Sequence, residues 1–252
     1  MNLHIETLGL GRDLVLLHGW GMHGGVWNSV KEKLAERFRL HILDLPGFGH
    51  SAAIAPYTLS HLVESIASQV PENIVLCGWS LGGQVALQWA LQRPQQLEKL
   101  LLVSATPRFI REPTWEYGIE LETFRQFADG VQNDYQPAIT RFLSLQAQGG
   151  EDARHTTREL KAHFFQRPAP DKQALQAGLQ ILLDADFRDS AAEIRVPTCV
   201  LHGDRDRIAP LAAGEWLAHC LSAELHVCKN ASHAPFLSHP AWFLERVTEF
   251  LA

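Results

Sequence analysis

The stretch LCGWSLGGQ, residues 76–84, places a single serine between glycines directly after a short apolar run. Gly78, Ser80 and Gly82 form a G-x-S-x-G pattern between a predicted strand and a predicted helix. In that context the pattern indicates a sharp turn that lifts a serine above a sheet, and the glycines remove Cβ atoms that would collide. The backbone N–H of Leu81 can then point at an oxyanion. The alternative is a serine that caps a helix beside packing glycines.

An activated serine needs a base and an acid that orients the base, and after such a turn the chain order is serine, acid, histidine. The segment HGDRDRIAP, residues 202–210, follows a predicted strand and offers two aspartates. We favour Asp206 as the acid, because it is the third residue beyond Gly203 and Pro210 rigidifies the end of the loop. The alternative role of Asp204 is a turn residue that bonds local amides. His233 follows the last predicted strand and is the preferred base. His239 is the weaker candidate, because it precedes a proline at a predicted helix start.

A second glycine pattern, GWGMHG at residues 19–24, formally matches a dinucleotide-binding fingerprint. Asp44 ends the next predicted strand, where a ribose-binding acid belongs. That interpretation leaves the Ser80 turn unexplained. The same glycines can instead turn a loop under a substrate carbonyl, with the Trp20 N–H as the second oxyanion donor. We favour this interpretation because one set of residues then explains both patterns.

Short apolar runs recur along the chain, apolar at consecutive positions as in strands that are covered on both faces. They are residues 14–18, 40–44, 74–78, 100–104, 198–203 and 224–228. Between most of them lie amphipathic stretches of helical spacing: residues 27–38, 59–70 and 81–92. This alternation predicts the α/β class, with a mostly parallel, doubly wound sheet.

The alternation stops between residues 106 and 189, which contain no convincing buried strand. Apolar residues at helical spacing, including Phe124 and Phe164, predict an all-helical insertion there. We therefore expect a core formed by residues 1–105 and 190–252, with residues 106–189 inserted between its two parts.

Composition excludes several classes of protein. The chain has 252 residues and a formal net charge of −6, which argues against nucleic acid as the main partner. Its start lacks the pattern of a signal peptide, and its apolar runs are shorter than the roughly 20 residues of a membrane span. The scattered cysteines indicate reduced thiols of a cytoplasmic protein, and the histidines lack metal-ligand spacing. We expect no metal and no cofactor.

HGWG, DLPGFGHS, GWSLGG, GDRD and ASHAPF occur in this order along the chain. With these motifs the chain resembles the α/β-hydrolase superfamily over its whole length. The resemblance implies that Ser80 is the nucleophile, Asp206 the acid and His233 the base. It also implies that the helical insertion is a lid over the active site.

Within this superfamily the chain is similar to the carboxylesterases that hydrolyse the methyl ester of pimeloyl-[acyl-carrier protein] in biotin synthesis. LLHGWGM, RFLSLQ at residues 141–146 and HAPFLSHP carry the likeness. The resemblance implies a substrate site that includes the oxyanion-hole residues, the triad serine and histidine, and a lid segment. These residues are Trp20, Ser80, Leu81, Phe142, Leu143, Ser144, Leu145, Gln146 and His233.

The same resemblance implies that lid arginines contact the acidic carrier protein. Arg141, Arg154 and Arg158 match three of these arginines, whereas Pro137 stands where the family example has another. Basic residues outnumber acidic ones over residues 141–172, in agreement with an acidic partner. A helix face that carries like charges only for solubility is the alternative. We expect a monomer.

Three other functions share part of this pattern. A hydrolase of another ester, a thioester or a C–C bond would use the same catalytic residues. A ligand-binding receptor that has kept the triad would bind tightly and turn over very slowly. A nicotinamide-dependent oxidoreductase would be protected by its cofactor in thermal melts, which a serine hydrolase would not be.

Overall fold

A seven-stranded sheet forms the centre of the molecule, which we describe over residues 3–252 from a computed structural model. The strand order is β1-β3-β2-β4-β5-β6-β7. The strands are β1 (Ile5–Leu8), β2 (Arg12–Leu17), β3 (Phe38–Leu43), β4 (Ile74–Trp79), β5 (Leu97–Val103), β6 (Thr198–Gly203) and β7 (Glu224–Cys228). Every neighbouring pair is parallel except β1 and β3, so the predicted α/β class with a mostly parallel sheet is confirmed.

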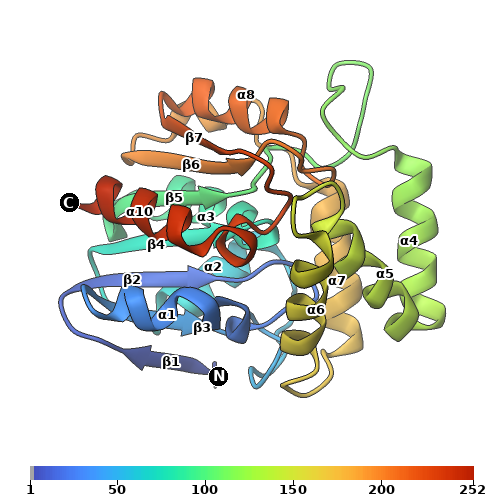
Figure 1. The fold of residues 1–252 in the computed structure, drawn as a ribbon, viewed down its shortest axis with the longest axis horizontal. Helices are drawn as coiled ribbons and strands as arrows, with labels where there is room; N and C mark the ends of the chain where they lie inside the picture. Colours follow the sequence, from blue (N-terminus) through green and yellow to red (C-terminus); the bar gives the residue numbers. More distant parts are fainter. Residues whose placement is uncertain (1–2) are drawn as a thin grey trace.

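Helices cover both faces of the sheet, which explains why the inner strands are apolar at consecutive positions. In Figure 1, α1 and α10 lie in front of the sheet and α2 and α3 lie behind it. The core helices are α1 (Asn28–Ala35), α2 (Leu59–Ala67), α3 (Leu81–Gln92), α8 (Leu211–Leu221), α9 (Pro235–Ser238) and α10 (Pro240–Leu251). Short 3-10 turns are η1 (Gly24–Trp27), η2 (Pro94–Gln96) and η3 (Ala191–Glu193). None of the helices within residues 3–252 is long and apolar enough to cross a membrane.

The sequence pattern did not reveal β1. This strand lies at the edge of the sheet and pairs antiparallel with β3, with Ile5 opposite Leu43. Its side chains are half-buried or exposed, because only one neighbouring strand and little covering structure protect them. An edge strand of this kind lacks the continuous apolar run that marks the buried strands.

Four helices lie between β5 and β6, where the all-helical insertion was predicted: α4 (Leu121–Asn133), α5 (Tyr135–Ala147), α6 (Ala153–Phe164) and α7 (Lys172–Asp184). We call α4–α7 the lid. Figure 1 shows the lid beyond the carboxyl ends of the parallel strands. That edge of an open α/β sheet is where ligands bind. The exact division of the chain at residues 105 and 190 stays a prediction.

The lid leaves and rejoins the core at neighbouring points. The Phe187 N–H donates to the Pro107 carbonyl at 3.0 Å. Arg108 Nη1 lies 3.5 Å from Asp186 Oδ2, and the two residues form a short antiparallel bridge. The segments before and after the lid are therefore bonded to each other, and the chain enters and leaves the lid at the same place.

Candidate active site

Ser80 occupies a strained turn between β4 and α3. Its φ of +56° and ψ of −115° lie in a region that residues with a side chain rarely adopt. A Cβ on Gly78 would overlap the Gly82 carbonyl, and a Cβ on Gly82 would lie 2.6 Å from the Leu17 carbonyl oxygen. The Ser80 N–H donates to the Val103 carbonyl at 3.1 Å. The glycines are therefore required by the close approach of backbone, as the G-x-S-x-G pattern predicts.

The structure brings Ser80, His233 and Asp206 together from positions far apart in the chain. His233 Nε2 lies 2.9 Å from Ser80 Oγ, and His233 Nδ1 lies 2.7 Å from Asp206 Oδ2. The three residues are all buried. The distances are those of a hydrogen-bonded chain in which the imidazole can accept the serine proton while the carboxylate holds its tautomer.

Asp206 is kept ionised by its surroundings. Burial alone would raise the pKa of this carboxyl group, but the neighbouring His233 and His202 rings and the Ala209 N–H lower the pKa below its usual value. Asp206 Oδ1 accepts hydrogen bonds from the N–H groups of Ile208 and Ala209 at 2.9 Å and 3.0 Å. These bonds leave Asp206 Oδ2 facing His233.

Two contacts that the sequence did not predict hold the His233 backbone. The indole Nε1–H of Trp79 donates to the His233 carbonyl at 2.8 Å. The His233 N–H donates to the carbonyl of Gln146 in the lid at 3.0 Å. The imidazole is thus positioned from the nucleophile strand on one side and from α5 on the other. Trp79 lies within the serine motif, but only the folded chain shows which atom it holds.

The predicted oxyanion donors belong to two segments that adjoin Ser80. Leu81 is the first residue of α3, so its N–H belongs to the unpaired first turn of a helix. A Cβ on Gly19 would lie 3.2 Å from Ser80 Cβ, which places the loop of Gly19 and Trp20 directly against the serine. Trp20 is buried. That the main-chain N–H groups of Trp20 and Leu81 form the oxyanion hole stays a prediction.

His18 holds that loop through a hydrogen bond to the Gly19 carbonyl. Its Nδ1–H donates to the Gly19 carbonyl at 2.8 Å, and its Nε2 accepts from the Leu45 N–H at 2.9 Å. Both bonds are satisfied only by the neutral ring. Burial lowers the pKa of His18 to about 4, which agrees with the neutral form.

Asp44 does not form part of a dinucleotide site. Its Oδ1 accepts the Gly24 N–H at 2.7 Å, and its Oδ2 accepts the His50 N–H at 2.8 Å. It also pairs with Arg167, which lies between α6 and α7. The last glycine of the pattern opens the short turn η1, and the helix α1 begins only at Asn28, so no helix N-terminus follows the glycines directly as a pyrophosphate site would require. The glycine pattern therefore belongs to the loop beside Ser80.

The lid contacts the loop beside Ser80 through an aromatic cluster around Trp20. The Trp20 ring lies 5.4 Å from the Phe127 ring of α4 and 5.4 Å from the Phe142 ring of α5. The Trp20 Nε1–H donates to the Leu175 carbonyl of α7 at 2.9 Å. Trp20 thereby joins three lid helices to the loop beside Ser80.

The residues of the predicted substrate segment of α5 lie on two different sides of the helix. Phe142 contacts Trp20, the Gln146 carbonyl binds His233, and the Leu143 and Gln146 side chains are buried. Ser144 and Leu145 instead line an outer groove of about 490 Å³ between α5 and α6. Whether all of them contact substrate stays a prediction.

The three arginines matched to carrier docking are exposed on the lid. Arg141 on α5 and Arg154 on α6 line the outer groove. Arg158 follows one turn after Arg154 on α6, so the two lie on one helix face. Pro137 lies in the first turn of α5.

The competing candidates lie apart from the triad. Asp204 is exposed and its Oδ1 accepts the Asn230 N–H at 2.7 Å. His239 Nδ1 lies 2.9 Å from the Ser238 hydroxyl, between α9 and α10. No cluster of three or more metal-ligating side chains occurs in the part of the chain that the structure describes.

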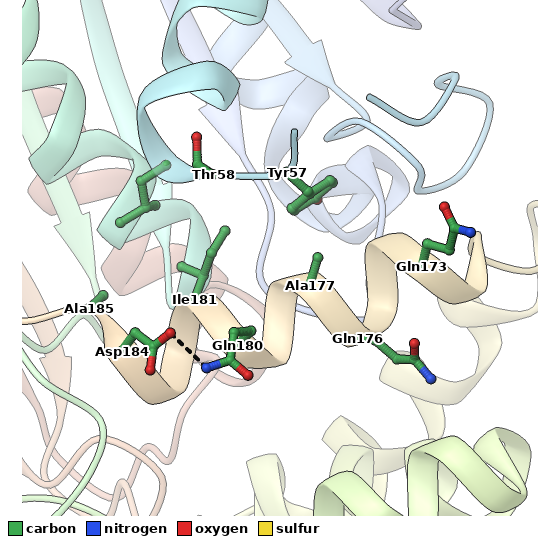
Figure 2. Close-up of a pocket in the computed structure, with 10 residues that line it drawn as sticks. Tyr57, Thr58, Gln173, Gln176, Ala177, Gln180, Ile181, Asp184 and Ala185 are labelled. Atoms are coloured by element: carbon green, nitrogen blue, oxygen red, sulfur yellow. Dashed lines mark hydrogen bonds between the residues drawn. The ribbon is translucent and has the colours of Figure 1, made fainter. Parts of the chain in front are cut away.

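A second, open groove of about 610 Å³ lies between α7 and residues 57–59. Figure 2 shows Gln173, Gln176 and Gln180 along α7, with Tyr57 and Thr58 across from the helix. Gln180 donates to Asp184 within the helix at 2.6 Å. None of the triad residues lines this groove.

The sequence pattern of the alpha/beta hydrolase family matches residues 14–246. The chain belongs to this family. A solved bromoperoxidase from Bacillus anthracis superposes with a TM-score of 0.91 at 21% identity, covering 99% of this chain and 95% of that one. An esterase from Exiguobacterium antarcticum superposes with a TM-score of 0.88 at 24% identity, covering 98% and 94%. These likenesses establish the fold of this hydrolase.

Much closer relatives in sequence are named pimeloyl-[acyl-carrier protein] methyl ester esterase. The one from Nitrosospira multiformis is 42% identical, covering 99% of this chain and 98% of its own length. The one from Chromobacterium violaceum is 41% identical, covering 100% and 98%. The likeness to this group of carboxylesterases, which the motifs indicated, is confirmed over the whole chain.

Proposed function

We propose that this hydrolase is a serine carboxylesterase that cleaves the methyl ester of pimeloyl-[acyl-carrier protein] to the free acid and methanol, a step of biotin synthesis. The hydrogen-bonded chain from Ser80 through His233 to Asp206 is the observation that carries the reaction type. The substrate follows from relatives about 40% identical over the full length that are named for it.

In the acylation step His233 Nε2 takes the proton of the Ser80 hydroxyl as Oγ attacks the ester carbonyl carbon. Asp206 accepts the Nδ1–H bond and stabilises the imidazolium that forms. The main-chain N–H groups of Trp20 and Leu81 stabilise the negative oxygen of the tetrahedral intermediate. One such donor contributes about 3–4 kcal/mol to the transition state.

The intermediate then collapses. His233 gives its proton to the methoxy oxygen, the C–O bond breaks, and methanol leaves an acyl-enzyme on Ser80. In the second half, His233 removes a proton from water, which attacks the acyl carbonyl. Ser80 leaves with the proton held by His233, and the free carboxylic acid is released.

The lid would bind the rest of the substrate. The apolar Phe142 and Leu143 would contact the acyl chain, and Gln146 would supply a polar contact. Arg141, Arg154 and Arg158 would attract an acidic carrier and chiefly raise the rate of association. The exposure of all three arginines is what supports this docking role.

The decisive experiment is mass spectrometry of methyl pimeloyl-carrier protein after incubation with the enzyme. We expect the substrate to lose the mass of one methylene unit, because a methyl ester becomes an acid. Ser80→Ala, which retains the fold but lacks the nucleophile, should leave the substrate unchanged. Cleavage of nitrophenyl esters without any cleavage of the carrier-bound ester would assign a different substrate.

The docking role calls for a second comparison. Arg154→Glu with Arg158→Glu should lower kcat/KM for the carrier-bound ester at least about tenfold, while a small free ester is cleaved at the wild-type rate. Arg37→Glu with Arg195→Glu makes the same charge change on exposed core positions and is the control. Equal losses on both esters would remove the docking role.

A further inference from the structure

A second imidazole lies against the triad acid. His202, in β6, is fully buried, and its Nε2 is 2.7 Å from the Ala209 carbonyl oxygen. The same Nε2 lies 3.5 Å from Asp206 Oδ2, the oxygen that binds His233. The catalytic steps of Ser80, His233 and Asp206 make no use of this residue.

The contacts of His202 determine its tautomer. The Ala209 carbonyl is an acceptor, so Nε2 must carry the hydrogen. Nδ1 has no hydrogen-bond partner within residues 3–252, and it faces Gly214 of α8, where a Cβ would overlap it. The neutral ring leaves only a lone pair unpaired there, whereas the cation would bury an unpaired N–H. Burial also lowers the pKa of His202.

The backbone of Ala209 is held at both of its polar groups. The Ala209 N–H donates to Asp206 Oδ1 at 3.0 Å, and the Ala209 carbonyl accepts from His202 Nε2–H at 2.7 Å. With Oδ1 fixed by the loop amides, Oδ2 is turned toward both His233 Nδ1 and the His202 N–H. His202 therefore fixes the loop that aims the carboxylate and places a donor beside the oxygen that binds the base.

We infer that His202 is a positioning residue for the triad: it sets the orientation of the Asp206 carboxylate toward His233 from behind the acid. This role rests on the proposed esterase function. The charged or titratable groups around the ring are Asp206 and His233 in the site and Glu215 on α8. The role requires only the Nε2–H of the neutral His202 ring, so no protonation of Nδ1 is involved.

The first test replaces His202 in two ways. His202→Leu removes the N–H, whereas His202→Gln keeps an amide N–H near the position of Nε2. On a short nitrophenyl ester we expect the leucine variant to lose about ten- to a hundredfold in kcat, because a shift of about 1 Å in catalytic geometry costs up to about 10²-fold. KM should stay within about twofold, and the glutamine variant should recover most of kcat.

A spectroscopic measurement separates positioning from general damage. The proton shared by His233 Nδ1 and Asp206 gives a downfield resonance in the proton NMR spectrum. It should move upfield or broaden in the leucine variant and stay in place in the glutamine variant. A folded leucine variant with wild-type kcat and an unchanged resonance would overturn the inference.

Gly214→Ala keeps the histidine but pushes its ring, and it carries the test if the leucine variant does not fold. We expect lower kcat with unchanged KM and a shifted resonance; wild-type values of both would contradict the role. The resonance does not depend on turnover. If the wild-type enzyme proved inactive on every ester, the proposed function would fail while the NMR comparison would still decide the positioning role.

Discussion

Asp204 and Asp206 lie two residues apart in one loop, yet their surroundings give them different chemistry. Asp206 is buried against His233, whereas Asp204 is exposed and binds a backbone amide of the next loop. The chain order of the motif narrowed the acid to these two residues, and the sequence favoured Asp206. The folded loop supplies the physical reason, because it turns the Asp206 carboxylate inward and the Asp204 carboxylate outward.

This difference predicts unequal effects of the same substitution. Asp206→Asn should lower kcat on a nitrophenyl ester by about 10⁴-fold, because an amide in this place favours the wrong tautomer of the base. Asp204→Asn keeps the oxygen that accepts the Asn230 N–H, so its kcat should stay within about twofold. Steady-state kinetics of the two variants check the assignment. Similar losses in both would mean that the acid is misidentified.

At the scale of helices and strands, the lid is bonded to the core at the junction of α6 and α7. Arg167 pairs there with Asp44, which is buried at the end of β3. His23 Nε2–H donates to the His163 carbonyl at 2.7 Å, and the Asp171 N–H donates to the Gly47 carbonyl at 2.8 Å. These bonds hold the covering helices over the carboxyl ends of the strands.

Sequence reasoning located these helices but not their fastening. Apolar periodicity indicated an all-helical insertion, because each lid helix buries one face. The Arg167 and Asp44 pair joins residues far apart in the chain, and periodicity carries no information about such pairs. Asp44 drew attention only because of its position after a glycine pattern, and no sequence pattern pointed to Arg167.

The buried pair predicts a large loss of stability when one partner is removed. Arg167→Met leaves Asp44 buried without its cation, so the free energy of unfolding should fall by about 3–5 kcal/mol. Adding Asp44→Asn should restore part of that loss, because the uncompensated charge is gone. Arg158→Met, on the exposed face of α6, is the matched control and should change stability by less than about 0.5 kcal/mol. Urea unfolding measures all three. A single Arg167 variant as stable as the control would show that the pair does not fasten the lid.

Across the whole molecule, several histidines are buried as neutral groups where the lid, the loop beside Ser80 and the sheet meet. His18 and His23 both bind backbone groups with both ring nitrogens. Burial is the main cause that lowers the pKa of each to about 4. The sequence showed thirteen histidines without a metal pattern, but it could not show which of them the fold keeps uncharged.

Neutral buried histidines make the fold sensitive to acid in a defined range. Between about pH 6.5 and about pH 4, His18 and His23 bind protons in the unfolded chain but stay neutral in the folded state. The free energy of unfolding should therefore fall as the pH is lowered through this range, by up to about 3 kcal/mol for each histidine. The lowered pKa of Asp44 and Asp206 adds a further loss only near and below about pH 4.

Urea unfolding at a series of pH values measures how steeply the free energy of unfolding depends on pH. His23→Gln should be less stable near pH 7, because it loses bonds to Gly25 and His163, but its slope should be shallower. The same slope in both proteins would mean that other groups take up the protons.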